Sequence, residues 1–111
     1  SRLIGTAKAR ELYFLSEKVD MEKAEQLGLI NGIFPEESLQ DEVMTIARRL
    51  AQGPTVAYRY MKENLNRAVH GEMGECLDME AAHHIHCGTT RDHKEAAQAF
   101  VDKREPNFQG R

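Results

Sequence analysis

The side chains best suited to chemistry gather in residues 76–87. Two thiols, three imidazoles and one carboxylate of this segment are potential metal ligands: Cys76, Glu80, His83, His84, His86 and Cys87. Steps of four, three, one and three residues place all of them except His86 on one broad face of a helix. Because zinc accepts imidazole and thiolate, a pair four residues apart such as His83 and Cys87 can hold one ion jointly.

Two considerations oppose a metal site in this segment. A structural zinc site needs four converging ligands, and no second Cys/His pair comes from another part of the chain. Cysteine is also commonly buried as a small apolar side chain. We therefore expect no metal ligands, while a metal-linked helical binding module built on His83, His84, His86 and Cys87 remains an alternative.

No complete catalytic set is present in the sequence. The Cys–His pair has no third orienting group and no recognisable oxyanion site. The carboxylate pairs Glu36-Glu37 and Asp41-Glu42 stand at an exposed helix start, where a raised pKa is not expected. Residues 71–74 contain two glycines but lack the preceding strand and the following lysine of a phosphate-binding loop. The sequence therefore predicts no catalytic residues.

A recognition surface is predicted near the C-terminus, where Phe100 lies one helical turn from Lys103 and Arg104 follows directly. A phosphate can accept charge-assisted hydrogen bonds from either cation, and an aromatic ring can stack on a purine. In the competing interpretation, Phe100 is a core or interface residue and the cations only offset the helix dipole. The residue types alone leave both interpretations open.

Helices must position all of these side chains. The apolar spacing, together with capping and breaking residues, predicts five or six helices with short connectors. The expected ranges are residues 5–15, 21–27, 38–50, 55–70, 75–87 and 89–104. Residues 29–34 form a short apolar run that is either a strand or an extended connector. Since no other segment resembles a strand, a parallel sheet is excluded and the fold class is all-α.

The last helix has signals at both ends. Thr89 or Thr90 can cap its first free N–H groups, and Asp92 and Glu95 suit its positive first turn. We expect Lys103 and Arg104 to close its last turn and Pro106 to stop it. The spacing further predicts one shared helix face for four residues: Ala96, Ala99, Phe100 and Lys103.

Composition limits the class of protein. The chain has 111 residues, 41% of them hydrophobic and 30% charged, and a net charge of −3, which gives no support to nucleic-acid binding. No apolar run is long enough to span a membrane, and the first residues do not resemble a signal peptide. Two irregularly placed cysteines favour a reducing compartment, so a cytoplasmic location is expected. The apolar faces are narrow, rich in alanine and without Trp, which indicates that they pack against other protein.

Two stretches resemble the enoyl-CoA hydratase/isomerase (crotonase) family. The C-terminal stretch resembles the signature that ends these proteins: Thr90-x-Asp92-x-x-Glu95-x-x-x-Ala99-Phe100-x-x-Lys103-Arg104-x-Pro106-x-Phe108. The N-terminal stretch resembles the helix that follows the family's catalytic core: Gly5-x-x-x-Ala9-x-Glu11-Leu12-x-x-Leu15. The chain departs from the family pattern at Ala96, where glycine is frequent, and at Ser16-Glu17, where Thr-Gly is common.

The resemblance implies action on acyl-CoA thioesters, by hydration of a 2-enoyl group (a lyase reaction) or by double-bond isomerisation. The family's catalytic core, a spiral of β-β-α turns that holds the thioester oxyanion with two backbone N–H groups, would precede Ser1. Residues 1–111 would then be one region, the C-terminal helical part of a crotonase-like fold, which is inactive alone. No separate cofactor is implied, because coenzyme A is part of the substrate.

In the family this helical region joins subunits into trimers, often paired into hexamers, and helps to cover the acyl pocket. The resemblance implies that Phe100, Lys103 and Arg104 contact the adenine and ribose phosphate of CoA bound to a neighbouring subunit. Two other classes stay open: a free-standing helical binding module, and a purely structural oligomerisation domain.

Overall fold

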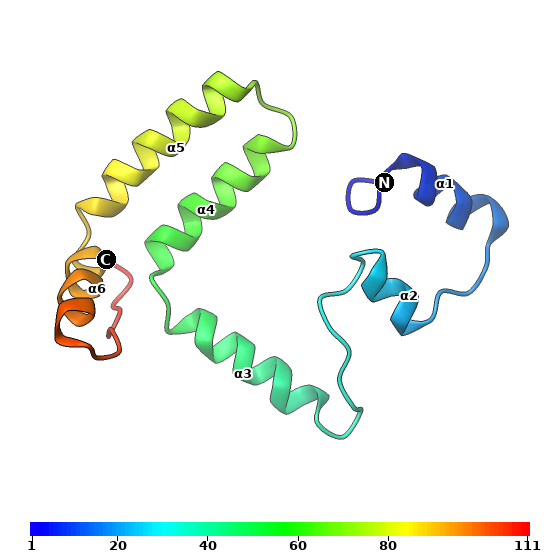
Figure 1. The fold of residues 1–111 in the computed structure, drawn as a ribbon, viewed down its shortest axis with the longest axis horizontal. Coiled ribbons are helices and arrows are strands. Elements are labelled where there is room, and N and C mark those ends of the chain that lie inside the picture. The colour runs from blue at the N-terminus through cyan, green and yellow to red at the C-terminus, as the bar shows by residue number, and fades with distance from the viewer. The chain divides into compact units, whose positions relative to one another are not determined.

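A computed structural model describes all 111 residues, and every regular element in it is a helix (Figure 1). The six helices are α1 Thr6–Leu15, α2 Met21–Gln26, α3 Leu39–Ala51, α4 Thr55–Ala68, α5 Met73–Gly88 and α6 Arg91–Asp102. Residues 29–34 contain no strand, so this run is a connector. The all-α prediction is confirmed. None of the helices combines the length and the apolar character needed to cross a membrane.

The chain divides into two compact units, Ser1–Val43 and Met44–Arg111. In the first unit, Ser16 ends α1 in the left-handed conformation and donates its N–H to the carbonyl of Leu12. The Asp20 carboxylate caps α2 by accepting the N–H of Lys23 at 2.7 Å, and Gly28 follows the helix with a φ of 71°. A side-chain cap therefore begins α2, and left-handed residues follow both helices.

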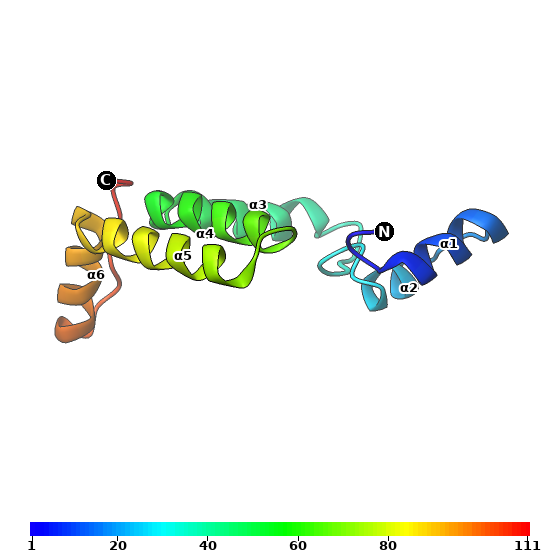
Figure 2. The same cartoon turned by 90° about the horizontal axis from the view of Figure 1, so that it is seen from above.

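In the second unit, α4 and α5 lie side by side as an antiparallel hairpin (Figures 1 and 2). His83 of α5 stacks on Tyr60 of α4 with ring centroids 4.3 Å apart, and its Nδ1 lies 2.5 Å from Oδ1 of Asn64. At the loop end of the hairpin, Arg67 forms an ion pair with Glu75. Polar and aromatic contacts thus set the register of the two helices.

The structure corrects both ends of α5. The helix starts at Met73, earlier than Glu75, because the carbonyl of Glu72 already accepts the N–H of Cys76 at 3.0 Å. Gly88 does not stop the helix but is its last residue. The hydroxyls of Thr89 and Thr90 follow it and donate to carbonyls of the final turn, at 2.8 and 2.7 Å.

The structure also corrects the end of α6. The helix stops at Asp102, so Lys103 and Arg104 do not close its last turn, and Pro106 lies four residues beyond it. Lys103 adopts the left-handed conformation (φ 55°) and donates its N–H to the carbonyls of Ala99 and Phe100. This turn, rather than a proline, ends the helix. At the other end, Thr90 is confirmed as the cap, since its hydroxyl accepts the N–H of His93 at 3.1 Å.

Very little apolar surface is buried within the chain. The only buried apolar residues are Ala9 and Ala99, and no large side chain is fully buried. The apolar stripe predicted for α3 is present but exposed, as are many large side chains on α4, α5 and α6: Met61, Leu65, Met73, Leu77, Ile85, Phe100 and Val101. The helices therefore keep apolar faces that nothing in this chain covers.

Candidate functional site

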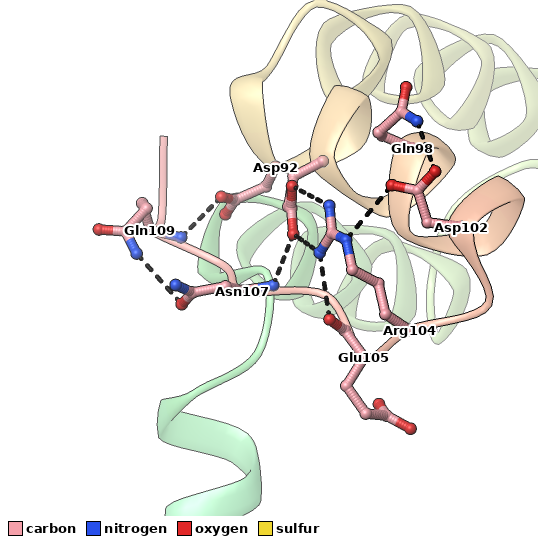
Figure 3. Close-up of polar contacts among 8 residues, drawn as sticks. Asp92, Gln98, Asp102, Arg104, Glu105, Asn107 and Gln109 are labelled. Carbon is pink, nitrogen blue, oxygen red and sulfur yellow. Dashed lines mark hydrogen bonds and ion pairs between the residues drawn. The ribbon is translucent and has the colours of Figure 1, made fainter.

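The C-terminal tail folds back along α6 and is held at the start of that helix. Asp92 is 3% exposed, and one of its carboxylate oxygens accepts the N–H of Gln109 at 2.7 Å (Figure 3). The other oxygen accepts the N–H of Gly110 at 2.8 Å. The N–H of Asp92 in turn donates to the carbonyl of Arg111 at 3.1 Å. Three hydrogen bonds therefore join the first turn of α6 to the last three residues.

A second anchor lies one turn further along α6. The Glu95 carboxylate receives two hydrogen bonds from the Arg104 guanidinium, at 2.6 and 3.0 Å, and a third from the N–H of Asn107 at 2.9 Å. Arg104 also lies 3.4 Å from Asp102. The hydrogen bonds from Arg104 and then from Asn107 lower the pKa of Glu95 to about 2, and Glu95 raises the pKa of Arg104. We call the contacts of Asp92 and Glu95 with residues 104–111 the tail clasp.

The end of the tail also reaches α4. Phe108 lines a small, mainly apolar cavity of about 130 Å³ together with Pro54 and Val56 at the start of α4 and Ala96 of α6. Gly110 has a φ of 71°, and a Cβ at this position would lie 2.6 Å from the Thr55 hydroxyl. The tail therefore connects the beginning of α4 with the beginning of α6.

The predicted recognition residues lie at the opposite end of α6. Phe100 is 85% exposed, and Lys103 is exposed immediately after the helix. Ala99, by contrast, is 1% exposed, so it packs inward while Phe100 points to solvent. Lys103 lies beyond the end of α6 and is therefore not part of the helix face predicted for it together with Ala96, Ala99 and Phe100. An exposed aromatic ring can stack on a flat ring, and an exposed ammonium group can bind an anion.

Arg104 is separated from Phe100 and Lys103 by its contacts. Its guanidinium is paired with Glu95 and Asp102 and also donates to the carbonyl of Glu105 at 3.2 Å. The structure thus gives Arg104 a role in holding the tail. Its predicted contact with CoA stays a prediction, as do those of Phe100 and Lys103.

The histidine-rich segment faces α4 along part of its length. Four of its residues, Glu80, His83, His84 and Cys87, line a concavity between the two helices, and His86 is exposed. The ring nitrogens of His83 face Asn64 and, at 3.4 Å, the Glu63 carboxylate. No three His, Cys, Asp or Glu side chains lie together so as to hold a metal ion. The metal-linked alternative therefore gains no support from the geometry.

Two arrangements of side chains were not predicted from the sequence. Sequence analysis assigned Asp92 to the helix dipole, whereas the structure uses it to hold the tail. The glycine near the end of the chain was the available signal, because a left-handed residue is typical of a chain that turns back. It also missed that Tyr60 and Asn64, four residues apart on α4, both contact His83.

Comparison with known proteins decides the family. A sequence profile for enoyl-CoA hydratase/isomerase matches residues 1–111. The chain belongs to the enoyl-CoA hydratase/isomerase family. It is 32% identical over 110 residues to 1,2-epoxyphenylacetyl-CoA isomerase of Escherichia coli K12, covering 99% of this chain and 42% of that protein. It is also 32% identical over 100 residues to the short-chain-enoyl-CoA hydratase of Clostridioides difficile, covering 90% and 64%.

Solved enoyl-CoA hydratases share the same arrangement of helices. A hydratase subunit I from Geobacillus kaustophilus is 35% identical with a TM-score of 0.91, and the match covers 99% of this chain and 43% of that one. An enoyl-CoA hydratase from Bacillus anthracis is 29% identical with a TM-score of 0.91, covering the same shares. The chain therefore matches part of the crotonase fold and spans about two fifths of the length of most of these relatives. The family acts on acyl-CoA thioesters.

Proposed function

We propose that this chain is the C-terminal assembly and CoA-covering module of an acyl-CoA hydratase/isomerase. In the complete enzyme, the reaction would be hydration of a 2-enoyl-CoA or isomerisation of its double bond. The observation that carries the proposal is that Phe100 and Lys103, three residues apart, are both exposed at the end of a helix held by its own tail. A reducing, cytoplasmic location belongs to the proposal and agrees with the two free thiols, Cys76 and Cys87.

The exposure of Phe100 supports a ligand contact. Burying a phenylalanine side chain is worth about 1.5–3 kcal/mol, so an isolated ring that is 85% exposed gains stability from any flat apolar partner. The adenine of coenzyme A is such a partner, and its ribose phosphate supplies the anion for Lys103. In an oligomer, the CoA would be bound by the core of a neighbouring subunit.

Substitutions in the complete enzyme test this contact. We expect Lys103→Ala to weaken CoA-ester binding by about 1 kcal/mol or more, because a hydrogen bond to a charged group is lost. Phe100→Ala should weaken binding similarly, and both changes should raise KM for substrates of every acyl length while leaving kcat unaltered. Lys94→Ala is the matched control, since Lys94 is also an exposed lysine of α6. An unchanged KM across substrates would contradict the contact.

Catalysis is proposed to reside in polypeptide that precedes Ser1. Two carboxylates of α6, Asp92 and Glu95, are committed to the clasp and are therefore not free to act on a thioester. We therefore expect the isolated chain to show no hydratase turnover with a short enoyl-CoA. Turnover that is abolished by changing a residue of this chain would contradict the proposal, and the upstream reading frame should encode a glycine-rich spiral core.

Assembly is the second part of the proposed role. The uncovered apolar side chains of α3, α4 and α5 are too numerous for a stable free surface, because contiguous exposed apolar patches mark sites of association. We propose that these faces pack against the catalytic core and against other subunits, as a trimer or a hexamer of identical chains.

A further inference from the structure

We infer that Asp92 is a positioning residue: through the tail, it sets the direction in which α6 presents Phe100 and Lys103. The inference rests on the proposed contact of these two residues with CoA. It assigns an indirect role in binding to Asp92, for which the sequence predicted no such role. It also gives the tail a structural role in that binding.

The contacts of Asp92 hold the tail in place on α6. A carboxylate that is 3% exposed must have its charge compensated by hydrogen bonds, and here both oxygens accept backbone N–H groups of the tail. The hydrogen bonds to this carboxylate come from the backbone N–H groups of Gln109 and Gly110. The docking of the tail therefore depends on the position of α6.

The tail carries this constraint to α4. Phe108 shares a small cavity with Pro54 and Val56, and Gly110 approaches Thr55 so closely that only a glycine fits without a shift. Glu95 fixes the other end of the tail through Arg104. Hence α6 is tied to the α4–α5 hairpin by residues 104–111 as well as by its own packing on α5.

Asp92 cannot act on the ligand directly. Phe100 lies eight positions further along α6, which corresponds to about 12 Å along the helix axis, and Lys103 follows beyond the end of the helix. Any effect of Asp92 on CoA binding must therefore pass through the orientation of α6. A small rotation at the start of the helix displaces its far end the most, where the two recognition residues stand.

The test is a double-mutant cycle in the complete enzyme. We expect Asp92→Asn to raise KM for CoA esters roughly three- to tenfold with kcat unchanged. The same substitution should have no further effect when Phe100 and Lys103 are already alanine, because it acts through them. Amide hydrogen exchange at Gln109 and Gly110 should accelerate in Asp92→Asn, which shows that the tail has been released.

Two further variants provide a second way to disturb the tail and a control. Gly110→Ala should give the same rise in KM, since it disturbs the tail from the side of α4 while leaving every side chain of α6 intact. Gln98→Ala is the control, because Gln98 bonds only Asp102 within α6, at 2.9 Å, and it should leave KM and tail exchange unchanged.

Each outcome discriminates. If Asp92→Asn and Gly110→Ala release the tail without raising KM, or raise KM equally in the background lacking Phe100 and Lys103, then Asp92 does not position those residues. If instead the Phe100/Lys103 double variant itself leaves KM unchanged, the proposed CoA contact fails first, and the positioning role falls with it.

Discussion

Adjacent residues of α6 have opposite environments, and this contrast defines the helix. Ala99 is 1% exposed, whereas Phe100, the next residue, is 85% exposed. Consecutive positions on a helix point about 100° apart, so one turns toward the rest of the unit and the other to solvent. The small residue at the buried position allows α6 to lie close to its neighbours, and the large one at the exposed position is available for a ligand.

Enlarging the buried alanine should destabilise the chain. We expect Ala99→Leu to lower the free energy of unfolding by about 1–3 kcal/mol, since extra methylenes at a closed site force neighbouring side chains to move. The midpoint of denaturant unfolding, followed by circular dichroism, measures this change. Ala97→Leu makes the same substitution at an exposed position of the same helix and should be nearly neutral. Equal losses in both variants would show that Ala99 is not closely packed.

At the scale of the element, α6 depends on local side chains at both ends. Thr90 accepts the N–H of His93 and donates to the carbonyl of Cys87, so one hydroxyl serves the start of α6 and the end of α5. Beyond the far end of the helix, the Arg104 guanidinium donates a hydrogen bond to the Glu95 carboxylate. The tail clasp therefore replaces the stabilisation that a cation in the last turn would otherwise supply.

Removing the cap should cost more than removing the neighbouring hydroxyl. We expect Thr90→Ala to lower the free energy of unfolding by about 1–2 kcal/mol, because a free N–H of the first turn loses its acceptor. Thr89→Ala removes a hydroxyl that only donates to the carbonyl of His86 and should have a smaller effect. Thermal unfolding of the two variants side by side provides the measurement. A larger loss of stability for Thr89→Ala would show that Thr89, and not Thr90, caps the helix.

The ion pair of Glu95 should make tail docking sensitive to acid. Its pKa in the folded chain, about 2, lies below the ordinary value of 4.5. The stabilisation is therefore fully present above pH 4.5 and is lost as the pH falls from 4.5 toward 2. The chemical shift of the Asn107 amide, followed by NMR, should report this loss. Glu95→Gln should abolish the step, whereas Glu105→Gln, which changes no contact of the clasp, should preserve it.

At the scale of the whole molecule, the exposed apolar faces are the dominant feature. Only two alanines form the apolar core, while side chains such as Leu77 and Ile85 of α5 are 56% and 69% exposed. A chain with so little internal burial gains much of its stability from contacts with other protein. This is the physical basis for the proposed role of the region in assembly.

The isolated chain should associate with itself. Sedimentation at micromolar concentration should show oligomers, and Leu77→Lys combined with Ile85→Lys should weaken association at least about tenfold, because each apolar side chain is worth about 1.5–3 kcal/mol when buried. A pair of lysines at exposed polar positions, Gln98→Lys with Gln52→Lys, is the control. A monomer at all concentrations would contradict the assembly role.

The sequence by itself determined the helices and the family. The cap by Thr90 and the apolar spacing are local signals, so they could be read without knowledge of the fold. The match to the terminal motif likewise depended only on residue order. These features act over a few residues, which is why sequence analysis recovered them.

Tertiary structure alone decided what Asp92, Glu95 and Arg104 do. The side-chain hydrogen bonds that join Asp92 and Glu95 to the tail span nine to eighteen residues of the chain, across a turn whose direction is set by the left-handed Lys103. Sequence spacing predicts neighbours on one helix but not a tail that returns beside it. The charges expected to offset the helix dipole bond instead to the tail, because direct hydrogen bonds to a charged group are stronger than an interaction with a screened dipole.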